Sequence, residues 1–318
     1  MTRGCILLFS PPGRFFLAFV PYHHSPCYSQ AELTWPALTM TLEQKKNKLA
    51  AILKDMESVL IAFSGGVDST LVLAMARSVL GKEKTLAVTA QSESLPQREL
   101  EDTQKLAGKL DVEHLIIATE EMASHEYRKN PVNRCYHCKS ELYTKLSAIA
   151  SKRHLAHIVN GINRDDLGDF RPGIAAAKDF GVASPLAEAG FTKQDIRELS
   201  HELGLSTWEK PAMACLSSRV PYGQAISPEK LAMIEQAEDL LYSLGFTELR
   251  VRHHGDIARI ELKKDELPKI ILKPVSDLVL KRFKEIGFSF VTVDLEGFRS
   301  GSLNEGLTEA AKETSGHV

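Results

Sequence analysis

The cysteines of the segment NRCYHCKS are the first candidates for chemistry. Cys135 and Cys138 stand three positions apart, and Cys215 follows in the Pro- and Ser-rich stretch KPAMACLSSR. Three thiolates, two of them at this spacing, are enough to provide three ligands of a metal site. A structural zinc site needs a fourth ligand, and His137 is the nearest candidate, although its position between the two cysteines is awkward. A redox pair and two buried structural thiols are the alternatives.

The string SGGVDS, Ser64 to Ser69, lies where an apolar strand runs into a helix. Gly65 and Gly66 allow a ligand to approach the backbone closely and permit unusual dihedral angles. The free N–H groups of the following helix favour an anion, and Ser64 and Ser69 add hydroxyl donors. Asp68 suits an anion site only if a divalent cation such as Mg²⁺ binds with the phosphates. The string is neither a Walker loop nor a dinucleotide fingerprint, and a plain Gly-rich turn is the alternative.

Two arginines at strand spacing are candidates for a phosphate site. Arg250 and Arg252 are two residues apart, so their guanidinium groups face the same side of a strand. Two planar forks on one face suit a phosphate, whereas a solvated sheet face is the alternative. Further candidates nearby are Arg219, His254, Glu235 and Glu238, and of the two carboxylates Glu238 is favoured as the one that orients the arginines.

Other polar and aromatic residues have less specific patterns. Asp165, Asp166 and Asp169 in NRDDLGDFRPG either help to bind Mg²⁺ or cap a helix. Trp208 is more typical of core or loop packing than of a stacking platform.

The elements that must position these residues follow an alternating pattern. Short apolar runs of buried-strand type alternate with helical segments, which is typical of a parallel sheet with helices on both faces. The expected strands are residues 58–63, 85–90, 112–119 and 157–163. Helices are expected at 41–56, 71–81, 95–110 and 139–153, and then at 191–205. We therefore predict an α/β fold.

After about residue 170 the pattern changes to a smaller α+β unit. It contains a long helix that opens at Ser227-Pro228, a hairpin with a Gly-Asp turn, and a helical stretch interrupted at Pro274. We predict a leader at 1–40 that is disordered or lies before the true start at Met40, so that Cys5 and Cys27 carry no function. The predicted domains are 41–225 for the α/β part and 226–303 for substrate binding or oligomerisation, followed by a flexible tail at 304–318.

Composition excludes several classes of protein. The 318 residues carry a net charge of -2, which does not suggest a nucleic-acid binder. The sequence contains no run of about 18 apolar residues, so we predict no membrane span. An odd and low count of five cysteines argues against a disulfide scaffold and for a reducing compartment, so we expect a cytoplasmic protein.

The SGGVDS string resembles the loop of the ATP pyrophosphatases, or PP-loop enzymes. The resemblance implies that the loop residues hold ATP phosphates with Mg²⁺. It also implies that a substrate oxygen attacks the α-phosphate, with loss of pyrophosphate and formation of an adenylate. This superfamily contains enzymes that add nitrogen and enzymes that add sulfur, and the loop alone does not distinguish them.

The blocks NPVNRCYHCKSELYTKL, NGINRDDLGDF to SSRVPYG and RVRHHGDIARIEL resemble the ATP-dependent sacrificial sulfur transferases. That family serves the nickel-pincer nucleotide cofactor of lactate racemase, and the resemblance covers about residues 41 to 300. It implies a pyridinium-3,5-dicarboxylic acid mononucleotide as substrate and a thiocarboxylate as product. It also implies that the matching arginines bind the substrate phosphate. The expected partner is thus a small-molecule nucleotide, and a homo-oligomer is expected.

The number of cysteines selects between two variants of this family. Members with a single cysteine, matching Cys215, give up that residue's own sulfur and retain dehydroalanine. Members with three cysteines resemble this chain and hold a [4Fe–4S] cluster whose open iron carries the sulfide donor. The resemblance therefore implies a cluster on Cys135, Cys138 and Cys215. A PP-loop tRNA thiolase, an amide synthetase that uses ammonia and a zinc-containing regulator are the competing hypotheses.

Overall fold

The structure is a computed structural model that describes residues 6–10, 14–18, 40–168, 172–212, 214–299, 301–305 and 307. The chain divides into two units, Met1–Met40 and Thr41–Val318, and each is considered by itself. In the first unit, β1 (Ile6–Ser10) pairs antiparallel with β2 (Arg14–Ala18). Cys5 and Cys27 lie outside the described residues, and the predicted lack of function for this leader stays a prediction.

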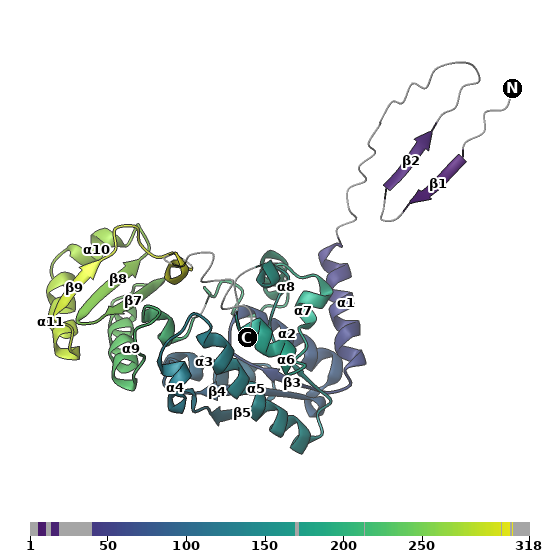
Figure 1. Cartoon of the computed structure of the whole chain (residues 1–318), viewed down its shortest axis with the longest axis horizontal. Coiled ribbons are helices and arrows are strands. Elements are labelled where there is room, and N and C mark those ends of the chain that lie inside the picture. The colour runs from purple at the N-terminus through teal and green to yellow at the C-terminus, as the bar shows by residue number, and fades with distance from the viewer. Residues whose placement is uncertain are drawn as a thin grey trace, which may run out of the picture. The chain divides into compact units, whose positions relative to one another are not determined.

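A four-stranded parallel sheet lies at the centre of the second unit, in the order β5–β4–β3–β6 (Figure 1). Alternation along β3 places Val59 and Ile61 in the hydrophobic core on one face of the sheet and Leu60 in the core on the other. Continuous apolar strands of this kind are typical of sheets that are covered on both faces. The strands are β3 (Val59–Ala62), β4 (Thr85–Gln91), β5 (Glu113–Ala118) and β6 (His157–Val159).

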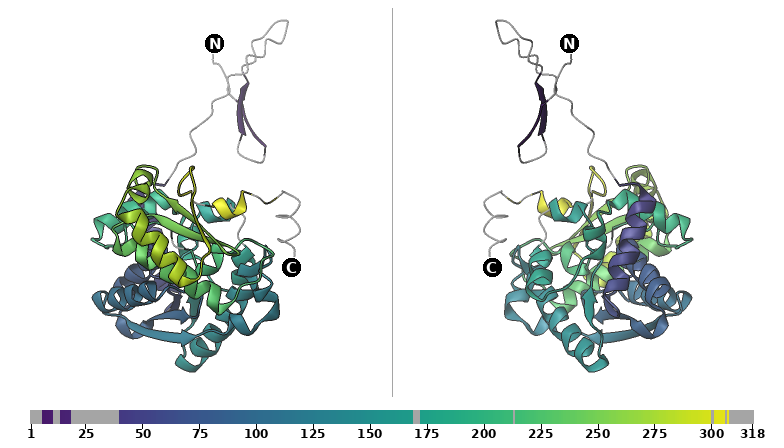
Figure 2. Two further views of the ribbon diagram at one scale, coloured as in Figure 1. Left: turned by 90° about the vertical axis from the view of Figure 1, so that its left-hand side faces the viewer. Right: turned by 90° about the vertical axis from the view of Figure 1, so that its right-hand side faces the viewer.

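Helices cover both faces of this sheet, as the sequence predicts. One core combines side chains of α1 (Leu42–Asp55), α2 (Val67–Leu80), α3 (Gln97–Lys109), α7 (Pro185–Ala189) and α8 (Lys193–Glu202) with β3 and β4. The core on the other face is built from α5 (Arg134–Arg153) and α6 (Pro172–Asp179). The right-hand view of Figure 2 shows α1 on the outside of this part. The predicted α/β class is confirmed.

Capping residues explain where several helices begin. Thr41 and Gln44 form a capping box at the start of α1, and Thr192 and Asp195 form one at the start of α8. Ser227 caps α9 (Pro228–Ser243), with Pro228 in its first turn as the sequence predicts.

A smaller mixed sheet, β7–β8–β9, occupies the C-terminal part of the second unit. β7 (Leu249–His254) and β8 (Ile257–Leu262) form the expected hairpin, in which Gly255 has a φ of 68°. β9 (Phe290–Val293) runs parallel to β8. This sheet shares a hydrophobic core with α9, α10 (Leu267–Ile271) and α11 (Val275–Ile286), and the last two are separated at Pro274 as expected.

Among the described residues, no helix is long and apolar enough to cross a membrane.

Several short elements are not evident from the sequence pattern. The short elements are α4 (His125–Arg128) and the 3₁₀ turns at Lys82–Lys84, Glu121–Ala123, Asp165–Gly168, Leu216–Arg219 and Ser302–Asn304.

Candidate active site

The SGGVDS loop connects β3 to α2, so its backbone N–H groups lie at a helix N-terminus. Gly65 has a φ of 71°, whereas Gly66 has an ordinary extended conformation as the N-cap. The hydroxyl oxygens of Ser64 and Ser69 are 3.1 Å apart, and the Ser64 amide donates to Ser69 Oγ at 3.3 Å. Of the two glycines, only Gly65 therefore adopts a conformation that other residues avoid.

Two close contacts hold this loop. A Cβ at Gly65 would lie 2.8 Å from Cγ2 of Thr103 on α3. A Cβ at Gly161, which follows β6, would lie 2.8 Å from the Ser69 nitrogen. A side chain at either position would displace its neighbour, so the loop is packed between α3 and the segment after β6.

The Asp68 carboxylate is paired with a lysine from a distant helix. The Lys193 ammonium donates to both Asp68 oxygens, at 2.8 and 2.6 Å, and Asn163 Nδ2 donates to Oδ1 at 3.2 Å. The backbone amide of Lys193 donates to Asp165 at 2.8 Å, which fixes the first turn of α8. Asp68 is partly exposed, so it remains accessible to a cation that arrives with phosphates.

The three predicted cysteines come together from two segments, and all three are free thiols. α5 begins at Arg134, several residues before the helix that the sequence predicts, so Cys135 and Cys138 occupy its first turns on one face. Cys138 packs against a core cluster that contains Leu216, the neighbour of Cys215.

The thiols lie close enough to influence each other's titration. Burial and the Glu121 carboxylate raise the pKa of Cys138, Lys139 opposes the rise, and Cys215 and Cys135 add to it. Desolvation of its thiol also raises the pKa of Cys135, with Arg134 opposing and Cys215 adding. A shared site that stabilises thiolates needs a cation or a metal group to offset this.

Within the described ranges, no three His, Cys, Asp or Glu side chains are arranged to hold a single metal ion. This finding covers the three cysteines both with and without His137, so the zinc site and the cluster on these cysteines both stay predictions. The ligands of a cluster bind different iron atoms and need not converge on one point. Three free thiols flanked by the Arg134 and Lys139 cations are a donor set that fits such a cluster.

A buried network ties the cysteine helix to the Cys215 loop. Asn130, in a left-handed conformation with a φ of 57°, donates from Nδ2 to the carbonyls of Val220, Pro221 and Gln224 at 3.1, 2.8 and 3.1 Å. Arg134 donates to Asn130 Oδ1 and to the Ser217 carbonyl at 3.1 Å.

The hydroxyls of Tyr127 and Ser217 are also 2.7 Å apart. Together these contacts link the start of α5 to the segment that carries Cys215.

Arg219 and Glu238 form a buried, bidentate ion pair, with Nε–Oε1 and Nη2–Oε2 distances of 2.9 Å. Arg219 Nη1 also donates to the Cys215 carbonyl at 2.8 Å. Burial opposes the charge on each partner, yet their mutual attraction outweighs it. The pKa of Arg219 is therefore raised and that of Glu238 is lowered. The pair holds α9 against the Cys215 loop.

Arg250 and Arg252 have different surroundings. Arg252 makes a bidentate pair with buried Glu261, at 3.0 and 2.8 Å, and donates to the Ser218 carbonyl at 2.8 Å. The Arg250 guanidinium donates to the carbonyls of Leu249 and Ala212, at 2.7 and 3.0 Å, and its Cζ lies 5.0 Å from the centroid of the Phe298 ring. Burial and the neighbouring positive charge of Arg219 lower the pKa of Arg250 to about 10. Arg250 is therefore the better placed of the two to bind an anion.

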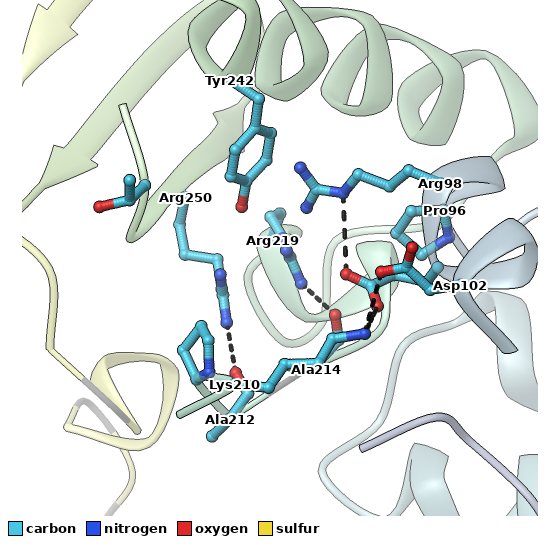
Figure 3. Close-up of a pocket in the computed structure, with 12 residues that line it drawn as sticks. Pro96, Arg98, Asp102, Lys210, Ala212, Ala214, Arg219, Tyr242 and Arg250 are labelled. Carbon is cyan, nitrogen blue, oxygen red and sulfur yellow. Dashed lines mark hydrogen bonds and ion pairs between the residues drawn. The ribbon is translucent and has the colours of Figure 1, made fainter. Parts of the chain in front are cut away.

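A cavity of about 270 Å³ lies beside Arg250 (Figure 3). Figure 3 shows the Tyr242 ring above Arg219, with Arg250 to the left and Arg98 to the right. Lys210 also lines the cavity and pairs with Glu99 and Asp102 at 2.8 and 3.2 Å. The cavity wall includes Ala214, the neighbour of Cys215, so the cavity lies next to the cysteine site. The other lining residues are Pro96, Pro211, Ala212 and Thr247.

The remaining predicted candidates have structural contacts. Glu235 accepts the Gln97 amide at 2.6 Å and so caps α3, and Asp166 accepts the Asn163 amide at 3.0 Å. Trp208 packs edge-on against His201, as expected for loop packing. His254 lies at the end of β7, and Asp169 lies outside the described residues.

Sequence reasoning missed several residues that the fold brings to the site. A capping signal at Thr192 indicates where α8 begins, but no local pattern relates Lys193 to Asp68. Each of the others also has a partner far away in the sequence, and they are Asn130, Arg134, Arg98, Lys210 and Tyr242.

Comparison with known proteins decides the family. The family model for NAD synthase matches residues 38–137, which include the SGGVDS loop. An uncharacterized protein of Synechocystis sp. is 45% identical over 268 residues, which is 84% of this chain and 100% of that protein. The pyridinium-3,5-bisthiocarboxylic acid mononucleotide synthase of Lactiplantibacillus plantarum is 40% identical over 274 residues, 86% of this chain and 99% of that enzyme. The chain belongs to the pyridinium-3,5-bisthiocarboxylic acid mononucleotide synthase family. Synthases of this family are ATP-using sulfurtransferases with the PP-loop fold.

More distant relatives share only part of the chain. The tRNA-specific 2-thiouridylase of Rickettsia typhi is 26% identical over 191 residues, 49% of this chain and 53% of that enzyme. The synthase family match extends well beyond this region and includes the segments that carry the cysteines and the arginines.

Proposed function

We propose that the protein uses ATP to adenylate a carboxylate of pyridinium-3,5-dicarboxylic acid mononucleotide and then replaces AMP with sulfur. The product is a thiocarboxylate for the nickel-pincer cofactor of lactate racemase. The observation that carries the proposal is a cavity lined by arginines next to the Cys215 loop, in a chain with a PP-loop in which Cys135 and Cys138 lie near Cys215. The 40% identity to the synthase of Lactiplantibacillus plantarum supports the choice of substrate.

The ATP half of the reaction uses the SGGVDS loop. Ser64, Gly65, Gly66 and Ser69 offer backbone N–H groups and hydroxyls to the phosphates, and Asp68 would hold Mg²⁺. A substrate carboxylate oxygen attacks the α-phosphorus while the bond to pyrophosphate breaks. The acyl adenylate and pyrophosphate are the products of this step.

The sulfur half uses the cysteines. Cys135, Cys138 and Cys215 would hold a [4Fe–4S] cluster, which would supply sulfur at the oxidation level of sulfide. Arg134 and Lys139 lie beside these thiols and offset negative charge. Attack by sulfur on the acyl carbon then expels AMP.

In the alternative variant, the Cys215 sulfur attacks the acyl carbon and AMP leaves. Loss of the Cys215 Cα proton and cleavage of its Cβ–Sγ bond then release the thiocarboxylate and leave dehydroalanine. This variant needs only one cysteine, so it leaves Cys135 and Cys138 without a role.

The substrate phosphate is proposed to bind at the arginine site. Among the described residues, the Arg250 guanidinium forms no ion pair with a carboxylate, and Arg252 lies on the same strand. Arg219 and Glu238 hold α9 and the Cys215 loop around the cavity. We further propose that the protein is cytoplasmic and forms a homo-oligomer. Light scattering on the purified protein tests the oligomeric state.

Anaerobic reconstitution with iron and sulfide tests the sulfur half. We expect a visible cluster absorbance and a thiocarboxylate product with the wild-type protein, and loss of both with Cys135→Ser, Cys138→Ser or Cys215→Ser. Cys27→Ser is the matched control, because the proposal gives that cysteine no role. Dehydroalanine at position 215 after turnover would indicate the single-cysteine variant. Colourless protein with stoichiometric zinc would refute the cluster, and full turnover by all three variants would favour an amide synthetase.

A tRNA thiolase is the second candidate, because the thiouridylase of Rickettsia typhi shares about half of the chain. The net charge of -2 does not favour RNA binding. A gel shift with bulk tRNA at low salt separates the two functions, since the proposed function predicts no shift.

A further inference from the structure

The cavity of Figure 3 is lined by more basic than acidic side chains. Arg219 is fully engaged by Glu238, and Lys210 is engaged by Glu99 and Asp102. Arg98 and Arg250 line the same cavity without a bidentate carboxylate partner among the described residues. These two guanidinium groups are therefore the ones available to a ligand.

Arg98 is held in place by an aromatic ring. Its Cζ lies 3.4 Å from the centroid of the Tyr242 ring, which is a close stacking contact. Its Nε is buried without a hydrogen-bond partner, and its ion pair with Glu99 is long, at 3.7 Å. Glu99 is itself bound more closely by Lys210, at 2.8 Å. A buried guanidinium nitrogen that lacks an acceptor is costly unless a ligand provides one.

We propose that Arg98 is a further residue that binds the phosphate monoester of the substrate, beside Arg250, with Tyr242 fixing the plane of Arg98. Two guanidinium groups carry two positive charges, which match the two negative charges of a phosphate monoester. A carboxylate ligand has a single negative charge and would leave one guanidinium uncompensated. Arg252 is the other candidate to bind the phosphate together with Arg250, but its guanidinium already forms a bidentate pair with Glu261. The cavity volume of about 270 Å³ suits one end of a mononucleotide.

The position of the cavity agrees with this assignment. Arg98 belongs to α3 and Arg250 to β7, so the phosphate would bridge the α/β part and the smaller sheet. Glu235 from α9 caps α3 one residue before Arg98, which fixes the end of α3 at the cavity. The rest of the nucleotide would extend past Ala214 towards Cys215. The inference rests on the proposed function for the identity of the substrate.

Calorimetric titration tests the inference without turnover. The probes are a pyridine-carboxylate mononucleotide, the matching nucleoside without its phosphate, and inorganic phosphate. Arg98→Gln should weaken the mononucleotide about 10- to 100-fold, as expected for loss of a charged hydrogen bond, and should leave the nucleoside unchanged. Arg250→Gln should do the same. Arg98→Lys should retain part of the affinity, because a point charge replaces the planar fork.

Arg282→Gln is the matched control, because Arg282 is exposed on α11 and does not line the cavity. Tyr242→Leu should weaken the mononucleotide as well, and melting curves show whether any variant is unfolded. Unchanged affinity in a folded Arg98→Gln, or an equal loss for nucleoside and mononucleotide, overturns the role of Arg98. Wild-type protein that binds neither mononucleotide nor inorganic phosphate overturns it too. Absence of thiocarboxylate despite normal mononucleotide binding would instead refute the proposed function.

Discussion

At the scale of single residues, the partners of a charged side chain decide its role better than its position does. Arg219 and Arg252 are each paired with a buried carboxylate, whereas the hydrogen bonds of Arg250 among the described residues go to carbonyl oxygens. Removing one partner of a buried pair leaves the other charge uncompensated, which costs about 3–5 kcal/mol. We therefore regard the paired arginines as part of the framework and Arg250 as the one available to substrate.

Lys193 carries the first prediction at this scale. Its ammonium contacts both oxygens of Asp68, and it would lie beside the phosphates once Mg²⁺ occupies that carboxylate. Lys193→Met should raise the KM for ATP about 10- to 100-fold, because a charged hydrogen bond is lost. The same variant should bind Mg²⁺ alone more tightly, since Asp68 has lost a competing cation. Pyrophosphate release and magnesium titration measure the two effects.

Lys178→Met is the control for charge, because Lys178 lies exposed on α6. An unchanged KM for ATP in Lys193→Met would mean that the lysine only holds α8 in place.

Arg250 predicts a dependence on pH. Its lowered pKa of about 10 means that it loses its charge at a pH where most arginines keep theirs. The affinity for a phosphate monoester should therefore be constant near neutrality and fall as the pH rises through about 10. A bound anion stabilises the charged form and raises the pKa of Arg250 in the complex, so the fall in affinity begins near pH 10 and levels off above the pKa of the complex. Titrations across this range should show a smaller decline in Arg250→Gln, and an identical decline would contradict the assignment.

At the scale of elements, the start of α5 and the loop from Cys215 to Gln224 form one hydrogen-bonded unit. The sequence places a helix after the cysteines, whereas α5 begins before them. Asn133 offers no capping hydrogen bond from its side chain, so the usual signal of a helix start is absent. The start of this helix is fixed instead by Asn130 and Arg134, which bond to a loop far away in the sequence.

Asn130 carries the prediction at this scale. Asn130→Gly permits the left-handed backbone and removes the three donated hydrogen bonds, so it isolates the role of the side chain. The free energy of unfolding should fall by about 1–3 kcal/mol, because buried carbonyls lose their partners. Iron content after reconstitution should also fall, since the Cys215 loop is less firmly held. Urea denaturation and iron analysis measure these effects.

His154→Gly is the matched control, because His154 is exposed and also left-handed. It should be neutral or slightly stabilising. Equal unfolding midpoints for the two glycine variants would show that the Asn130 side chain contributes nothing.

At the scale of the whole molecule, local patterns predict the fold well and the site only in part. The apolar runs and the SGGVDS string are local, so the parallel sheet and the loop follow from them. The pairing of arginines depends on side-chain geometry across strands. The β7–β8 register sets Arg250 opposite Glu261, yet the Glu261 carboxylate binds Arg252. No spacing rule in a single sequence distinguishes these outcomes.

The domain boundary predicted near residue 225 remains a prediction. The cavity is lined from both sides of that boundary, by α3 and by α9 and β7. Folding of one part alone would therefore leave the proposed substrate site incomplete.

The helix α3 touches both halves of the reaction. Thr103 packs against Gly65 of the nucleotide loop, and Arg98, about 7.5 Å along the same helix axis, lines the cavity. A rigid helix cannot tilt at one end without moving at the other. If the substrate phosphate binds at Arg98 as proposed, α3 connects that end of the substrate to the loop proposed to hold ATP. A displacement of α3 on substrate binding would then change the packing of Thr103 against Gly65.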